Sequence, residues 1–191
     1  MKKNLALVSV FMVLMITLSG CISSNTPAAN RTNSDNPIAK VIPGGDGMNT
    51  IKNLPKGFKY VGNLSLSTGD IKNNYKAENV SGILRGSEKL YKGSNNSDFY
   101  LDVIQFENPA DANDFILMYK SSFTPLKEGS RFVEDLLDGH PAVRIIDYVT
   151  DEGKSVPRYS YIWNNENYVS VVSGNTVDCS LVRQLAEAAG R

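Results

Sequence analysis

A single imidazole and a single thiol outside the N-terminal region are the groups best suited to covalent catalysis. The 191 residues contain one histidine, His140, and two cysteines, Cys21 and Cys179. Cys179 follows Asp178, a residue type that caps helices, and amides at a helix start favour a negatively charged nucleophile. A Cys179–His140 pair is therefore the enzymatic alternative that this sequence offers. A buried structural cysteine and a turn histidine beside Pro141 explain the same residues without catalysis.

The composition excludes the common zinc sites and contains no complete catalytic motif. One histidine and two cysteines are too few for Cys₄, Cys₂His₂ or His₃ ligand sets. Gly153-Lys154-Ser155 resembles the end of a phosphate-binding loop, but position 148 is Tyr where that motif needs Gly. No Gly-x-Ser-x-Gly nucleophile elbow occurs. We therefore predict no metal site, no cofactor and no catalytic residues.

Four aromatic residues make the most informative pattern in the chain. Tyr159, Tyr161 and Trp163 alternate, so they share one face of a strand. A hairpin turn through residues 164–167 pairs Trp163 with Tyr168 and adds Tyr168 to the same face. The opposite face of this hairpin is aliphatic, which suits packing under helices.

The aromatic face is suited to binding as well as to burial. Aromatic rings offer a large contact area at a small cost in side-chain entropy, and they stack on the apolar faces of sugars. We predict that Tyr159, Tyr161, Trp163 and Tyr168 bind a ligand or partner, with Arg144 or Arg158 as polar anchors. The competing interpretation is that these rings belong to the core.

The elements that carry these residues predict an α+β domain. Phe58–Leu66, Val80–Gly86 and Asp98–Phe106 have the composition of strands. Asn108-Pro109 starts a helix that extends to about Ser122, and a last helix opens at Asp178. The remaining strands are Ala142–Val149, Arg158–Trp163 and Tyr168–Ser173. The order β-β-β-α-β-β-β-α predicts an antiparallel sheet of five to six strands with two helices on one face.

The N-terminus has the pattern of a secretory leader. Two lysines precede a 14-residue uncharged run, Leu5–Leu18, which is too short to span a bilayer and typical of a signal peptide. Leu18-Ser19-Gly20-Cys21 then resembles the lipobox of prokaryotic membrane lipoproteins. This resemblance is limited to the leader, and it implies cleavage before Cys21 and a diacylglyceryl thioether on its sulfur. Secretion with a coincidental cysteine remains the alternative.

Composition divides the rest of the chain into a tether and one domain. Residues 22–50 are rich in Ser, Thr, Asn, Pro and Gly, as in a flexible linker. We assign 1–20 to the signal peptide, 21–53 to the lipidated cysteine and tether, and 54–191 to a single domain. The predicted sequons at Asn30, Asn63, Asn79 and Asn95 are about as many as the composition produces by chance.

Charge and location together indicate the class of function. Cleavage removes two lysines, which leaves 18 basic and 20 acidic residues, so nucleic acid is not an expected partner. We predict a lipid-anchored, extracytoplasmic, non-catalytic binding or accessory protein at the cell membrane. Its partner is the membrane, through the anchor, together with a cell-envelope glycan or protein. The alternatives are an extracytoplasmic enzyme that uses Cys179 and His140, and a structural subunit of a membrane-associated complex.

Overall fold

The structure, a computed structural model, describes residues 51–190. The predicted signal peptide, Cys21 and nearly all of the predicted tether lie outside the described residues. Ile51, which we assigned to the tether, is buried against the domain core.

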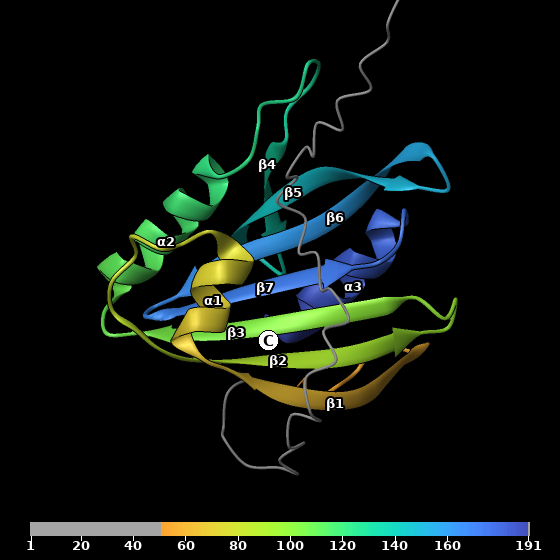
Figure 1. Ribbon diagram of the computed structural model, residues 1–191. Helices are drawn as coiled ribbons and strands as arrows, with labels where there is room; N and C mark the ends of the chain where they lie inside the picture. The colour runs from red at the N-terminus through yellow and green to blue at the C-terminus, as the bar shows by residue number, and fades with distance from the viewer. Residues whose placement is uncertain (1–50, 191) are drawn as a thin grey trace, which may run out of the picture.

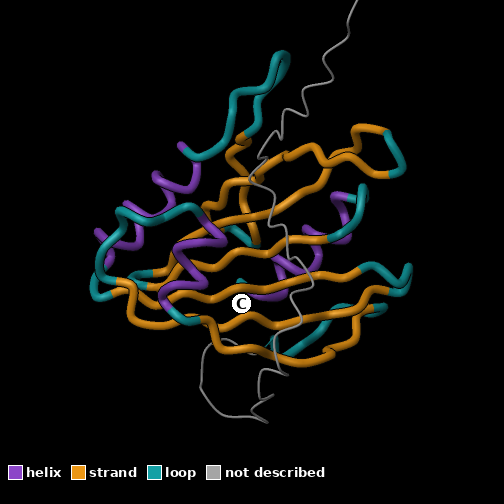
Figure 2. The backbone as a smooth tube through the Cα atoms, in the orientation of Figure 1, coloured by secondary structure: helices purple, strands orange, loops and turns teal. Residues whose placement is uncertain are grey.

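One antiparallel sheet organises the described residues (Figure 1). Its spatial order is β1-β2-β3-β7-β6-β5-β4, so β1 and β4 are the edge strands. In Figure 2 strands form a larger share of the described backbone than helices do. The strands are β1 (Phe58–Leu66), β2 (Ile83–Gly93), β3 (Asp98–Phe106), β4 (Phe132–Leu137), β5 (His140–Asp151), β6 (Lys154–Asn165) and β7 (Tyr168–Gly174).

Three helices cover the sheet, and they lie on both of its faces. The helices are α1 (Thr68–Tyr75), α2 (Pro109–Ser121) and α3 (Cys179–Ala189). Helices α1 and α2 lie in front of the sheet in Figure 1, and α3 lies behind it. Each face consequently has its own hydrophobic core.

The α+β class and the antiparallel sheet are confirmed, but the predicted count and layering are wrong. The sheet has seven strands rather than five or six, and three helices cover two faces rather than two helices one face. The missed elements are α1 and β4. Strand β2 also begins three residues later and ends seven residues later than the predicted Val80–Gly86. The observed order is β-α-β-β-α-β-β-β-β-α.

Short turns set the register of the C-terminal half of the sheet. Asp138-Gly139 and Glu152-Gly153 each have positive φ at both residues, as two-residue hairpin loops of type I′ require. Asn165 pairs with Tyr168, so the last hairpin has a two-residue loop. These tight turns keep β4, β5, β6 and β7 adjacent, so that alternate side chains of neighbouring strands line the face under α3.

The end of β7 lets α3 lie close to the sheet. A Cβ atom at Gly174 would lie 2.7 Å from the Phe99 ring and 2.9 Å from Val182 of α3. Val182, Leu185, Ala186 and Ala189 form the buried stripe of α3. A helix with one apolar stripe needs an apolar surface, and the aromatic face of β6 and β7 supplies it.

Candidate functional site

The structure places the four predicted aromatic residues on one face, as the alternation predicts. Trp163 lies opposite Ser170, and Asn165 lies opposite Tyr168, so the hairpin register differs by two residues from the predicted Trp163–Tyr168 pair. A shift of two residues preserves the face of every side chain. Tyr159, Tyr161, Trp163 and Tyr168 all pack against the core beneath α3.

Most of this face is buried, as the competing interpretation of a core face requires. Tyr161 is fully buried, Trp163 is only 7% exposed, and Tyr159 and Tyr168 are half-buried. The physical reason is that α3 uses this face as its packing surface, on the side of the sheet opposite α1 and α2. Tyr161 and Trp163 therefore present little surface to a ligand while α3 stays in place.

The two arginines proposed as polar anchors lie on opposite faces of the sheet. Arg144 pairs with Tyr161 across β5 and β6, so it lies on the aromatic face. Arg158 occupies the alternate position on β6, and its guanidinium donates hydrogen bonds to Asp151 and Asn175. Only Arg144 belongs to the same site as the tyrosines.

Arg144 and Tyr161 meet Cys179 at the start of α3. The Arg144 Nη1 atom lies 3.9 Å from the Cys179 Sγ atom, and the Tyr161 hydroxyl lies 3.8 Å from it. The pKa of Tyr161 is raised to about 12, mainly by burial and to a smaller extent by the hydrogen bond with Cys179. The structure does not bring His140 into hydrogen-bond contact with Cys179, because His140 is exposed at the start of β5, four residues before Arg144.

A salt-bridge network that the sequence did not reveal joins this cluster to β4. Arg183 of α3 donates from Nη1 to the Asp135 carboxylate at 2.7 Å and from Nη2 to the Leu136 carbonyl at 2.8 Å. Its Nε atom donates to Glu187, one helical turn further on, at 2.8 Å. The Glu187 pair has the (i, i+4) spacing of a helical ion pair, which is the only signal in the sequence. These contacts fasten α3 to the edge strand.

The contribution of Asp135 to the stability of the fold depends on pH. Burial alone would raise the pKa of this carboxyl, but hydrogen bonds from Arg183 and from the Leu136 amide outweigh burial and lower the pKa. A carboxyl whose pKa is lower in the folded state stabilises the fold above its unfolded-state pKa of about 4, and this stabilisation is lost as the pH falls through the folded-state value.

We expect Asp135→Asn to lower the free energy of unfolding by about 1 kcal/mol at pH 7, the scale of a partly exposed ion pair. The difference from the wild type should shrink as the pH falls below about 4. Chemical denaturation at pH 7, 4 and 3 measures it. Glu152→Gln, which changes an exposed carboxylate in the β5–β6 turn, is the control and should show no such trend. An Asp135→Asn effect that does not vary with pH would contradict the role assigned to the Arg183 pair.

A separate groove lies between α2 and the loop before β2. Its volume is about 400 Å³, within the range of small-ligand sites. The groove is lined by Asn79, Val80, Ser81, Asp114, Leu117, Met118 and Ser121. Leu117 stands 64% exposed at this surface. Sequence reasoning missed the groove because it is formed by residues of α2 and of the loop before β2 that are far apart in the sequence.

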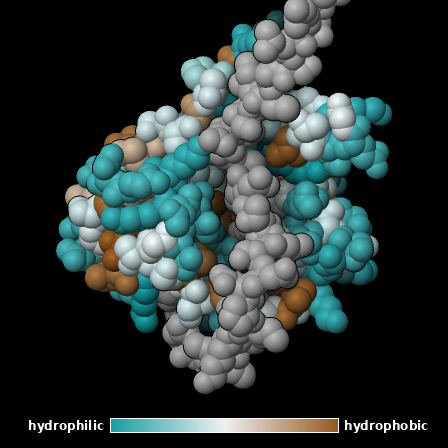
Figure 3. Space-filling view, viewed as in Figure 1, coloured by the Kyte–Doolittle hydropathy of each residue, from teal (hydrophilic) through white to brown (hydrophobic). Residues whose placement is uncertain are grey.

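Apolar side chains reach the surface at scattered points elsewhere. On the viewed face in Figure 3, outside the grey atoms, hydrophobic residues appear as separate spots between hydrophilic ones. Among residues 51–190, no three metal-ligating side chains gather, and no helix has the length and hydrophobicity to cross a bilayer.

The described residues thus form a seven-stranded antiparallel sheet with helices on both faces and an Arg–Tyr–Cys cluster at the start of α3. Comparison with protein-family models, curated proteins and solved structures finds no match for the chain.

Proposed function

We propose that this protein is a lipid-anchored extracytoplasmic domain that acts by binding rather than by catalysis. The observation that carries the proposal is the leader that ends in Leu18-Ser19-Gly20-Cys21. Two acyl chains on Cys21 would hold the protein stably to a membrane, whereas one chain gives only reversible binding. The described domain begins 30 residues after Cys21 and is connected to it through the predicted tether.

The geometry of the thiol cluster supports a structural role for Cys179. Its sulfur lies between an arginine and a tyrosine that also face the Asp135–Arg183 ion pair, and this ion pair fastens α3 to β4. The imidazole on which the enzymatic alternative depends makes no hydrogen bond to this thiol, which counts against a Cys179–His140 pair.

A ligand or partner would then bind at residues other than the buried Tyr161 and Trp163. Tyr159 and Tyr168 are half-buried at its margins, and the α2 groove is concave. A glycan of the cell envelope could stack on the tyrosine rings, whereas a small ligand would fit the groove.

We expect Cys21→Ser to move the protein from the membrane fraction to the soluble fraction, because the variant has no sulfur to acylate. Immunoblots of fractionated cells measure the distribution, and Cys179→Ser, which leaves the leader intact, is the matched control. Protease added to intact cells stripped of their wall should digest the wild-type domain. Membrane association of the Cys21→Ser variant equal to that of the wild type would contradict the lipid anchor, and protection from protease would contradict the extracytoplasmic location.

A further inference from the structure

The N-terminal edge of the domain is basic, although the chain as a whole is not. Residues 47–69 contain three lysines, Lys52, Lys56 and Lys59, and no acidic residue. All three side chains are exposed, and none makes an ion pair with another described residue. Residues 70–191 contain 13 basic and 18 acidic residues, a net charge of −5. The positive charge is therefore concentrated in the segment that follows the predicted tether.

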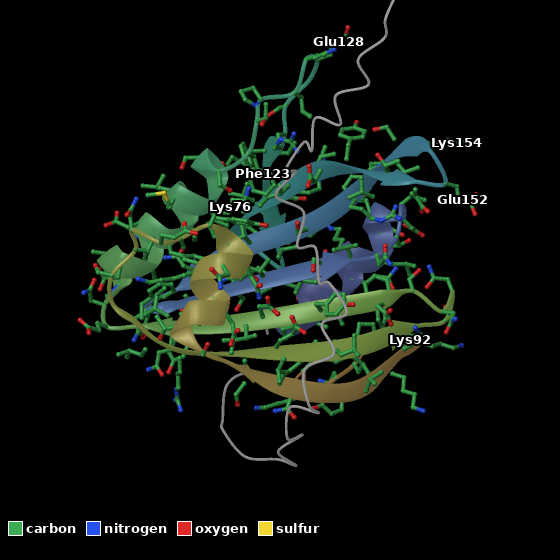
Figure 4. All side chains as sticks on the ribbon, viewed as in Figure 1. Lys76, Lys92, Phe123, Glu128, Glu152 and Lys154 are labelled. Carbon is green, nitrogen blue, oxygen red and sulfur yellow. The ribbon has the colours of Figure 1, made fainter. Side chains whose placement is uncertain are left out.

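The fold brings part of this stretch together at one end of the edge strand. Phe58 N–H donates to the Pro55 carbonyl at 3.1 Å, which closes the turn that carries Lys56. Lys59 lies directly opposite Lys92 on β2, and Lys92 pairs with Asp98 at 2.7 Å. Figure 4 labels Lys92 at this end of the sheet. The neighbouring hairpin thus adds a neutral pair and leaves the charge of Lys59 uncompensated.

Two exposed apolar side chains follow Lys59 along the edge strand, with Tyr60 on the face of β1 opposite to Lys59. Tyr60 is 48% exposed and Val61 is 54% exposed, and Val61 sits in a bulge of β1 between Tyr60 and Gly62. Tyrosine beside lysine is a combination typical of the membrane–water interface, where the ring lies among headgroups and the ammonium group meets lipid phosphates. We call Lys52, Lys56, Lys59, Tyr60 and Val61 the basic edge.

We propose that the basic edge docks the domain onto anionic phospholipid headgroups of the bilayer in which Cys21 is anchored. This inference rests on the proposed function, because it needs the anchor. A flexible chain of 29 residues spans roughly 30 Å, so the anchor would keep the basic edge within reach of the bilayer at a high effective concentration. A surface affinity too weak to bind a free protein then suffices, and the acidic remainder of the domain turns away from the negative surface.

The test uses the lipidated full-length protein, reconstituted in two kinds of vesicle. One kind is phosphatidylcholine alone, and the other contains about one third phosphatidylglycerol. The acetylation rate of each lysine, measured by mass spectrometry, reports its accessibility. Docking predicts that Lys52, Lys56 and Lys59 react several-fold more slowly in the anionic vesicles, while Lys127 and Lys154 react equally in both. High salt should remove the protection, because it screens the charges.

A matched pair of variants tests the charge dependence. Each lysine near an anionic surface changes the ratio of docked to undocked protein by about fivefold. Lys56→Gln should therefore lower that ratio by about fivefold, as measured by the acetylation rates of Lys52 and Lys59. The control is Lys127→Gln, which lies in the α2–β4 loop near the opposite edge strand and should not change the ratio.

The outcomes separate the docking from the anchor. Equal rates in both vesicles, or protection that survives high salt and Lys56→Gln, would overturn docking and leave the anchor intact. Failure of the purified protein to float with neutral vesicles would overturn the anchor, and with it the docking.

Discussion

Replacement of Trp163 by alanine should lower the free energy of unfolding by about 3–5 kcal/mol, the usual range for deletion of a buried aromatic ring. Trp163 lies in the core between the sheet and α3, and its neighbours there cannot collapse into the whole volume that the ring leaves. That loss is a large share of the 5–15 kcal/mol that stabilises a typical domain. Denaturant unfolding of the mature chain that carries Cys21→Ser, followed by circular dichroism, measures the change.

Tyr148→Ala is the control for this prediction, because Tyr148 is an aromatic residue on the neighbouring strand β5 with an exposed side chain. Its loss should change stability by less than about 1 kcal/mol. A Trp163→Ala variant as stable as Tyr148→Ala would show that Trp163 is not core. It would also restore the aromatic face as an accessible binding surface.

Replacement of Phe115 by alanine should destabilise the domain by a similar 3–5 kcal/mol, from the opposite face of the sheet. Phe115 of α2 is fully buried, and its ring lies 5.2 Å from that of Tyr75 in α1 and 5.3 Å from that of Phe106 in β3. Such aromatic pairs add about 0.5–1.5 kcal/mol each beyond area burial. The substitution therefore loosens both helices of this face at once.

Leu117→Ala, two residues along the same helix, is the matched control for Phe115→Ala. The Leu117 side chain is mostly exposed, so its truncation should have an effect within about 0.5 kcal/mol of zero in the same denaturation experiment. Equal effects of the two substitutions would contradict the packing of α2 on the sheet.

Strong local patterns allowed much of the fold to be predicted. Asp98–Phe106 has the apolar run of a buried central strand, and the structure assigns β3 to the same residues. Asn108, whose side chain caps α2 by accepting from the Asp111 amide, gave a clear start for that helix. The turn predicted through residues 164–167 does join two strands as a hairpin, β6 and β7, although its loop is two residues rather than four.

The missed elements have weak local signals. The α1 sequence contains Gly69, Asn73 and Asn74, which are poor helix formers, and only Ile71 and Tyr75 are buried. Its one clear signal is the capping box between Ser67 and Asp70. Packing of Ile71 and Tyr75 on the sheet overrides the low propensity. Strand β4 has only six residues, and strand β2 contains charged residues that obscure its alternation.

The burial of the aromatic face could not be read from alternation. Periodicity shows which side chains share a face of β6 and β7, but both faces of this hairpin are apolar enough to accept a helix. Which of the two faces α3 covers depends on tertiary packing, including the close approach of α3 to the sheet at Gly174. The Asp135–Arg183 pair was missed for the same reason, since its members are 48 residues apart in sequence.

The central claim, lipid anchoring at Cys21, is tested most directly by mass spectrometry of the N-terminal peptide of the protein purified from membranes. We predict a peptide that begins at Cys21 and carries the mass of a diacylglyceryl group on the sulfur. A peptide that retains Met1 or the Leu5–Leu18 run, or one that begins at an unmodified residue, would contradict it.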